Sequence, residues 1–237
     1  MKRSAICFFI LVISCAGCCH IQDKIERGYE YIDTEKPYLS ICVSFNPDKY
    51  KFHTIYPQFA VWLAYENDDG ELAYETVFVT QGTGKNQWVK FGGKWVRRKE
   101  ATPVWRYVKE NEKNIDIDAV TGATPIGQLF TMYIPVPEKI KNKHIDVYTE
   151  VNVSFDYNFY YCFHPINGQP SVVWKAALNM DPLESGQVTD AEIVGHGNVW
   201  GSNTKLYDDV SHVTSAKKLL NFIKVSYFNG RTQNIGH

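Results

Sequence analysis

The stretch "HIDVYTEVNVSF", residues His144 to Phe155, alternates apolar and polar side chains regularly. In an extended chain successive side chains point to opposite faces, so one face carries mostly apolar residues and the other mostly polar ones. Such a strand buries one face against a core and leaves the other to solvent. The apolar face comprises Ile145, Val147, Val151, Val153 and Phe155, and the polar face comprises Asp146, Tyr148, Glu150, Asn152 and Ser154.

Strand signals recur on both sides of this stretch. Residues 38–45 and 59–66 are rich in β-branched and aromatic residues, and the second segment is apolar on both faces, as expected of a central strand. The turn sequence "NDDG", Asn67 to Gly70, joins residues 59–66 to residues 71–80 as a hairpin. Further strands are predicted at residues 129–136, 171–178, 192–194 and 223–228.

One helix is predicted, late in the chain. In "SHVTSAKKLLNFI", Thr214 or Ser215 can cap a helix. The apolar residues at helical spacing in it are Ala216, Leu219, Leu220 and Ile223. Many short strands, turns between them and one short late helix predict an all-β fold, an antiparallel immunoglobulin-like β-sandwich.

The N-terminus has the pattern of a signal peptide. A short positive region, Met1-Lys2-Arg3, precedes an apolar run over residues 5–13. That run is far shorter than the roughly 18 to 20 apolar residues that cross a bilayer. A plain secretory signal, cleaved elsewhere, is one interpretation.

The run ends in "VISCAGCC", where Val12-Ile13-Ser14 before Cys15 resembles the lipobox of bacterial lipoproteins. The resemblance implies that Cys15 is lipidated, with Cys18 as the alternative, and that the protein is anchored on a membrane of the bacterial cell envelope, facing the periplasm or the exterior. The expected organisation is a signal peptide over residues 1–14, an anchor and tether over residues 15–37, and a single β-sandwich domain over residues 38–237.

Charge and cysteine content exclude some classes of partner and site. The formal net charge is −1, so the chain has no global field that attracts nucleic acid. Cysteines and histidines show no close spacing typical of a zinc site, and no metal is expected. Cys42 and Cys162 lie in the body of the protein and are expected either to form a disulfide or to be buried free thiols.

The segment from Lys85 to Trp105 interleaves tryptophans with basic residues. Cations beside flat rings can hold phosphates, sugars or flavin-like rings through charge and stacking, and a carbohydrate-binding module is one such possibility. The alternative is that the tryptophans pack in the core while the basic residues form a solvated face. The candidate ligand contacts are Trp88, Lys94, Trp95, Arg97 and Arg98.

Two further patterns are weaker evidence for a functional site. "GTGK", Gly82 to Lys85, lacks the spacing of a phosphate-binding loop and is predicted to be a glycine-rich hairpin tip. His164 and His196 are isolated histidines without a nucleophile-elbow pattern, so a hydrolase is not favoured.

"DAVTGATP", Asp118 to Pro125, is similar to the flavinylation motif of membrane-associated electron-transfer proteins. The resemblance implies that a flavin transferase moves FMN from FAD onto the hydroxyl of Thr124, as a phosphoester. The implied recognition residues are Asp118, Thr121, Gly122 and Ala123. The alternative is a structural loop in which Asp118 hydrogen-bonds the turn, Gly122 takes a positive φ and Pro125 starts the next segment.

A second resemblance covers most of the chain after the N-terminal segment. "PQFAVWLAYE", "ATPVWRY", "DAVTGATP", "YTEVNVSFDYN" and "NGQPSVVW" together resemble a predicted periplasmic β-sandwich family of unknown function. Its members occur alongside flavin transferases and extracytosolic redox proteins, which are the partners that the resemblance implies. It also implies that the threonine-glycine-alanine-threonine loop lies between the tryptophan-containing segment and the next strand.

The sequence thus predicts an extracytosolic, lipid-anchored accessory or binding protein of the cell envelope without catalytic activity, linked to flavin-based electron transfer. Two alternatives stay open. One is a covalent FMN carrier modified at Thr124, and the other is a module that binds carbohydrate or another small ligand.

Overall fold

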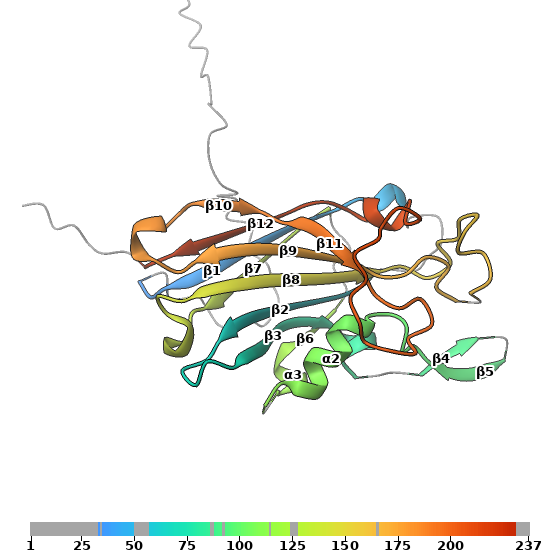
Figure 1. Ribbon diagram of the computed structural model, residues 1–237, viewed down its shortest axis with the longest axis horizontal. Coiled ribbons are helices and arrows are strands. Elements are labelled where there is room, and N and C mark those ends of the chain that lie inside the picture. Colours follow the sequence, from blue (N-terminus) through green and yellow to red (C-terminus); the bar gives the residue numbers. More distant parts are fainter. Residues whose placement is uncertain are drawn as a thin grey trace, which may run out of the picture. The chain divides into compact units, whose positions relative to one another are not determined.

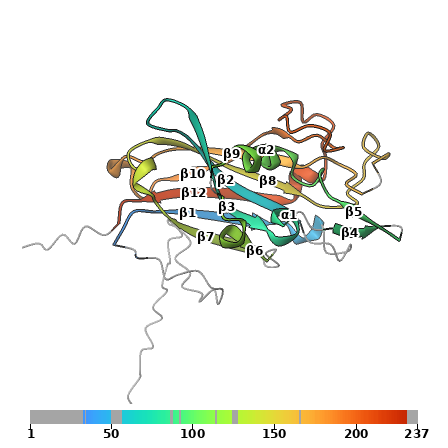
Figure 2. The same cartoon turned by 90° about the horizontal axis from the view of Figure 1, so that it is seen from below.

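Two β-sheets make up the body of the protein. The computed structural model describes residues 33, 35–49, 57–85, 88–91, 93–113, 115–123, 128–164 and 166–230. Within these residues the predicted all-β sandwich is confirmed, and its two layers are seen in Figures 1 and 2. The signal peptide, Cys15 and Cys18 lie outside the described residues.

The sheets contain four and six strands. The four-stranded sheet has the order β10 (Val188–Asp190), β12 (Leu220–Phe228), β1 (Tyr38–Phe45), β7 (Leu129–Pro135). The six-stranded sheet has the order β11 (Glu192–His196), β9 (Val172–Asn179), β8 (His144–Asn152), β2 (Gln58–Glu66), β3 (Leu72–Thr80), β6 (Thr121–Gly122). β4 (Trp88–Phe91) and β5 (Lys94–Arg97) pair separately as a hairpin.

Helical segments connect the strands. The α-helices are α1 (Gln81–Gly84), α2 (Pro103–Asn111) and α3 (Ile117–Val120). The short 3-10 turns are η1 (Pro47–Lys49), η3 (Glu138–Ile140), η4 (Pro182–Glu184) and η5 (Ala216–Lys218). None of the described helices is long and apolar enough to cross a membrane.

The main core fills the space between the sheets. β1 contributes Leu39, Ile41 and Val43, each with no exposed surface. The predicted apolar face of β8 lies in the same core at Ile145, Val147, Val151 and Val153, whereas Phe155 is partly exposed beyond the end of the strand. β2 is apolar on both faces because each face packs in a different core. Leu63 lies in the main core, and Trp62 lies in a second cluster. The predicted hairpin of β2 and β3 is also confirmed.

The second cluster lies on the outer face of the six-stranded sheet, where α2 packs (Figure 2). Pro103 occupies the first turn of α2, where its fixed φ suits a helix and its missing N–H costs nothing. Trp105 and Val108 lie three residues apart, so they share one face of the helix and are buried against the sheet. The alternation predicts that the polar face of β8 is exposed to solvent. Instead, α2 and the residues that lead into it cover Glu150 and Asn152 on that face.

Glu150 connects β8 to the start of α2. Its side chain has no exposed surface, and its carboxylate accepts hydrogen bonds from the backbone N of Trp105 at 2.7 Å, the backbone N of Val104 at 3.3 Å and the Ser171 hydroxyl at 2.6 Å. It thereby satisfies N–H groups that the first turn of a helix leaves without partners. Burial raises the pKa of Glu150 from 4.5 to about 7, against the opposing effect of these hydrogen bonds.

The late helix is present only as the single 3-10 turn η5. Leu220 and Ile223 belong to β12 instead, where they pair with Phe45 and Val43 of β1. Their helical spacing is overridden because pairing with β1 buries the same side chains in the main core.

The two cysteines of the body do not form the disulfide considered above. Cys42 is a buried, reduced thiol in β1, whereas Cys162 is a reduced thiol exposed on a loop.

The pKa of Glu150 makes stability depend on pH. Because this pKa is higher in the folded state, the folded protein holds more protons than the unfolded chain between pH 4.5 and about 7. Glu150 therefore stabilises the fold below pH 4.5, and about 3 kcal/mol of that contribution is lost as the pH rises through 7.

Urea unfolding of the wild type and Glu150→Gln across this pH range measures the effect. A glutamine can accept from the N–H of Trp105 and donate to Ser171, yet it does not titrate, so we expect a shallower pH slope in the variant. Identical slopes in both proteins would contradict the assignment.

Candidate functional site

Several connections between strands gather at one end of the sandwich, which we call the loop end. β2 begins beside the end of β8, and β9 begins beside the end of β11. Figure 1 shows the connections 81–102, 153–171 and 197–219 at the loop end, on the right of the view, whereas the β2–β3 turn lies at the opposite end. The chain enters the body at the opposite end, where Glu35 lies against Gly230.

The "DAVTGAT" stretch lies at the edge of the six-stranded sheet. It runs through α3 into β6, whose Thr121 and Gly122 pair in parallel with Val79 and Thr80 at the end of β3. In chain order the motif therefore follows α2 and precedes β7, and it forms the short strand β6 itself. Thr124, the implied acceptor, lies outside the described residues.

The backbone of this stretch differs from the predicted loop. Asp116, not Asp118, holds the turn, because its carboxylate accepts hydrogen bonds from the backbone N of Asp118 and of Ala119. Gly122 is not among the described residues with a positive φ. It is required for packing, since a Cβ atom there would lie 2.4 Å from Cε2 of the buried Phe78 ring.

The "GTGK" stretch packs against the motif. It forms the helical turn α1 rather than a hairpin tip. A Cβ atom at Gly84 would lie 2.8 Å from the hydroxyl of Thr121, so the two backbones approach closely. Lys85 Nζ lies 2.9 Å from the Asp118 carboxylate, and the Asp118 side chain is 83% exposed. Two motif-like stretches far apart in sequence therefore form one surface.

The basic tryptophan segment forms the hairpin β4–β5 at the loop end. Lys94 and Arg97 are exposed there, whereas the side chains of Trp88 and Trp95 lie outside the described part of the structure. Trp105 is buried under α2 and donates from Nε1 to the Thr76 hydroxyl at 3.1 Å. The segment therefore divides, with Lys94 and Arg97 on the surface and Trp105 in a core.

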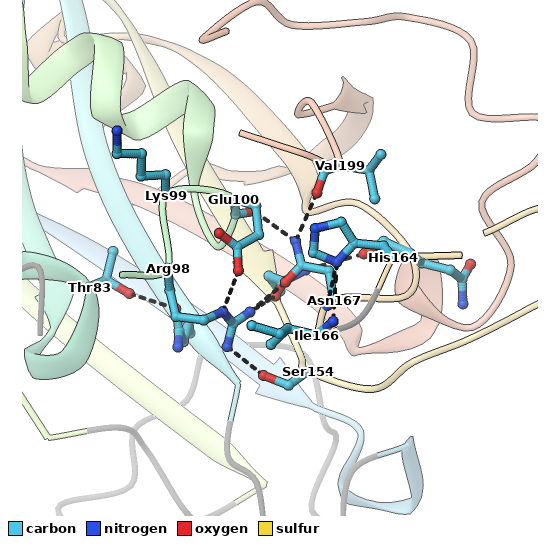
Figure 3. Close-up of polar contacts among 12 residues, drawn as sticks. Thr83, Arg98, Lys99, Glu100, Ser154, His164, Ile166, Asn167 and Val199 are labelled. Atoms are coloured by element: carbon cyan, nitrogen blue, oxygen red, sulfur yellow. Dashed lines mark hydrogen bonds and ion pairs between the residues drawn. The ribbon is translucent and has the colours of Figure 1, made fainter. Parts of the chain in front are cut away.

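Arg98 turns inward from this hairpin (Figure 3). Its guanidinium pairs with Glu100 at 2.6 Å, and the two side chains are 7% and 8% exposed. It also donates to the Ser154 hydroxyl at 2.6 Å and to the amide oxygens of Asn152 and Asn167. The guanidinium thus joins the hairpin, β8 and the connection 153–171. Its predicted contact with a ligand stays a prediction.

Asn167 and His164 extend this cluster toward the surface. Asn167 Nδ2 donates to the backbone O of Glu100 at 2.8 Å, and His164 Nδ1 accepts from the backbone N of Asn167 at 2.9 Å. Nδ1 therefore carries no proton, and burial lowers the pKa of His164, so the ring is held neutral. The His164 ring lies 4.6 Å from that of Trp200, between ring centroids.

The connection 153–171 is held rigidly at its base. Phe155 has a φ of 63°, a conformation rare for a bulky residue, and Asp156 bridges to Gly168. A Cβ atom at Gly168 would lie 2.4 Å from the backbone O of Asp156. Gln169 accepts at 2.6 Å from the backbone N of Thr214, which ties this base to the connection 197–219.

Beyond this base, aromatic side chains stand out into solvent. Phe159 is 99% exposed and Phe163 is 84% exposed. The Tyr160 ring stacks on His212 with centroids 3.9 Å apart, and Asn158 donates to the backbone O of His212 at 2.8 Å. We call the exposed residues Tyr157, Phe159, Tyr160, Phe163 and Trp200 the aromatic tip.

The sequence offers little warning of this surface. Phe159, Tyr160 and Phe163 stand in an aromatic run that resembles strand or core sequence, and Asn167 resembles an ordinary loop residue. The only local signal is the absence of Asp, Glu, Lys and Arg from residue 157 to residue 174.

No family model, curated protein or solved structure matches the chain significantly. The resemblances to the flavinylation motif and to the predicted periplasmic family therefore remain predictions.

Gly122→Ala tests whether the motif glycine is needed for packing. The added methyl group would collide with Phe78 in the core, so we expect the free energy of unfolding to fall by about 1–3 kcal/mol. Gly82→Ala is the matched control, because a Cβ atom there meets nothing within 4 Å. Urea unfolding measures both variants, and equal stabilities would show that Phe78 does not constrain Gly122.

Proposed function

We propose that this protein is a lipid-anchored, extracytosolic accessory protein that binds another component of the cell envelope through its loop end and has no catalytic activity of its own. The observation that carries the proposal is the aromatic tip, a group of exposed aromatic side chains on loops that buried and partly buried hydrogen bonds hold in place. Loops at one end of a rigid β-sandwich are a common binding surface, as in immunoglobulin variable domains.

Rigidity supports a binding role. The base of the connection 153–171 is fixed by the Asp156–Gly168 bridge, and its tip is fixed by Asn158, whose Oδ1 accepts from the backbone N of Tyr161 at 2.7 Å. Side chains that are ordered before binding lose less entropy when they bind. The composition of the loop end, rich in tyrosine and asparagine with a tryptophan, is also that of recognition loops in antibodies.

The buried ionisable groups at this end have structural partners. Glu150 binds the first turn of α2, Arg98 and Glu100 pair with each other, and His164 accepts from the backbone. Each group therefore stabilises a loop or helix. This arrangement supports a binding protein over a hydrolase.

Cys162 provides a direct test, because it is an exposed thiol between Tyr161 and Phe163. If the loop end is occupied in the envelope, a small impermeant maleimide should modify Cys162 about tenfold more slowly in cells than in the purified protein, as expected for roughly 90% occupancy. Cys18→Ser and Cys19→Ser remove competing thiols from both samples.

The control is Leu183→Cys combined with Cys162→Ser. Leu183 is 91% exposed in η4, at the end where the chain enters, so its thiol should react equally fast in cells and in solution. Equal rates for Cys162 in both samples would refute an occupied loop end.

A second candidate function is that of a covalent FMN carrier, which the exposure of the motif favours. Asp118 and Ala123 are exposed on the sheet edge, so a transferase can reach two of the four residues that it would recognise. In the transfer, the hydroxyl oxygen of Thr124 would attack the FMN phosphorus of FAD. The pyrophosphate bond would break, AMP would leave and the hydroxyl proton would pass to a base of the transferase.

Intact mass tests this candidate and the anchor together. The protein is expressed in the envelope of a host with a flavin transferase, beside its Thr124→Ala variant. A lipidated chain should begin at Cys15 and carry acyl mass, and an FMN carrier should show added FMN mass that is absent from the variant. Equal masses, apart from the substitution itself, would exclude flavin at Thr124, and a chain beginning elsewhere without acyl mass would exclude the anchor at Cys15.

A further inference from the structure

The aromatic tip is an uncharged surface. Residues 157–174 contain no Asp, Glu, Lys or Arg, and the tip places Phe159 and Phe163 in solvent with 99% and 84% of their surface exposed. Tyr157, Tyr160 and Trp200 beside them are 45%, 58% and 57% exposed. An exposed patch of this kind marks an interaction site, because hydration of large apolar side chains is unfavourable.

The side chains of the tip match the interfacial layer of a bilayer. Phenylalanine prefers the hydrocarbon boundary, whereas tyrosine and tryptophan place an apolar ring and a polar group across the boundary with water. Insertion of a charged group would be costly, and the stretch from Tyr157 to Trp174 contains none. The rings also stand on a fixed base, so little ordering is needed when they insert.

Cations lie next to Trp200. Arg106 donates to the backbone O of Lys99 at 3.2 Å and of Gly201 at 2.9 Å, and Lys205 follows on the same connection as Trp200. Asp208 and Asp209 are exposed further along that connection, so the charge beside the tip is mixed. Anionic headgroups should therefore assist binding only modestly, and the rings should supply most of the affinity.

The predicted anchor favours a bilayer over a soluble partner as the occupant. About 23 residues separate Cys15 from Tyr38, and such a chain can span at most ~80 Å. A strand of nine residues is only ~30 Å long, so the loop end is within reach of the membrane that holds the anchor. Tethering at this range gives an effective concentration near the millimolar level, enough for a weak contact to form.

We infer that the aromatic tip inserts into the interfacial layer of the lipid bilayer that carries the anchor, so that the body is held to the membrane at its loop end as well as through its N-terminus. This inference rests on the proposed function and names the occupant of the loop end.

The test uses the full lipidated protein in vesicles of phosphatidylethanolamine and phosphatidylglycerol. An environment-sensitive fluorophore is attached to Cys162, with Cys18 and Cys19 replaced by serine, and some lipids are brominated high in their acyl chains. We expect quenching of the label at Cys162 but not of the same label on Leu183→Cys.

Phe159→Ser and Phe163→Ser should each reduce the ratio of inserted to free tip about tenfold, the equivalent of about 1.4 kcal/mol. Both side chains are exposed, so the fold should not change. Leu72→Ser with Leu183→Ser, at the opposite end, is the matched control and should leave quenching unchanged.

Absence of quenching at Cys162, or quenching that survives both phenylalanine substitutions, would overturn the inference. If Cys162 is nevertheless protected in cells, the proposed function stands with another occupant. Binding of the purified protein to isolated peptidoglycan sacculi, lost with Phe159→Ser, would then identify that occupant as a glycan.

Discussion

The arrangement of the loop end depends on the contacts of the Arg98 guanidinium. It lies between the β4–β5 hairpin, the end of β8 and the connection 153–171, and it bonds to Glu100, Ser154 and Asn167. A buried ion pair contributes little net stability, because both charges lose their hydration. Loss of one partner is far more costly, at about 3–5 kcal/mol, since it leaves the other charge buried alone. The pair therefore acts chiefly to specify one arrangement of the three segments. The β4–β5 hairpin does not pair with β8 in a common sheet, so side-chain contacts must fix its position.

The outer face of β8 organises these segments. Glu150 and Asn152 stand two positions apart in β8, so they point the same way from the strand, and Ser154 follows in the turn after it. Glu150 holds the first turn of α2, whereas Asn152 and Ser154 hold Arg98. The polar alternation that suggests a solvated face thus provides fixed hydrogen-bonding positions for segments packed over the sheet. The inner face of the same strand remains ordinary apolar core.

The parts of the fold that the sequence predicts are those in which local pattern and tertiary packing agree. The apolar positions of residues 144–152 and the "NDDG" hairpin are of this kind. Leu220 and Ile223 show the opposite case, because their helical spacing loses to pairing with β1. α2 is not predicted, since its aromatic and β-branched residues suggest a strand, and its one local signal is Pro103 at the start.

The candidate site is predictable only in part for the same reason. Basic residues near tryptophans mark the β4–β5 hairpin, but nothing local separates the inward Arg98 from the exposed Arg97 beside it. That difference depends on Asn152 and Asn167, which are 54 and 69 residues away in sequence. At the loop end, Phe155 has a positive φ, charges are buried and Phe159 lies in water. Each feature is unfavourable by itself. Such features persist where the contacts of the surrounding structure hold them in place. Their concentration on one rigidly held surface is what distinguishes a binding end from a set of connecting loops.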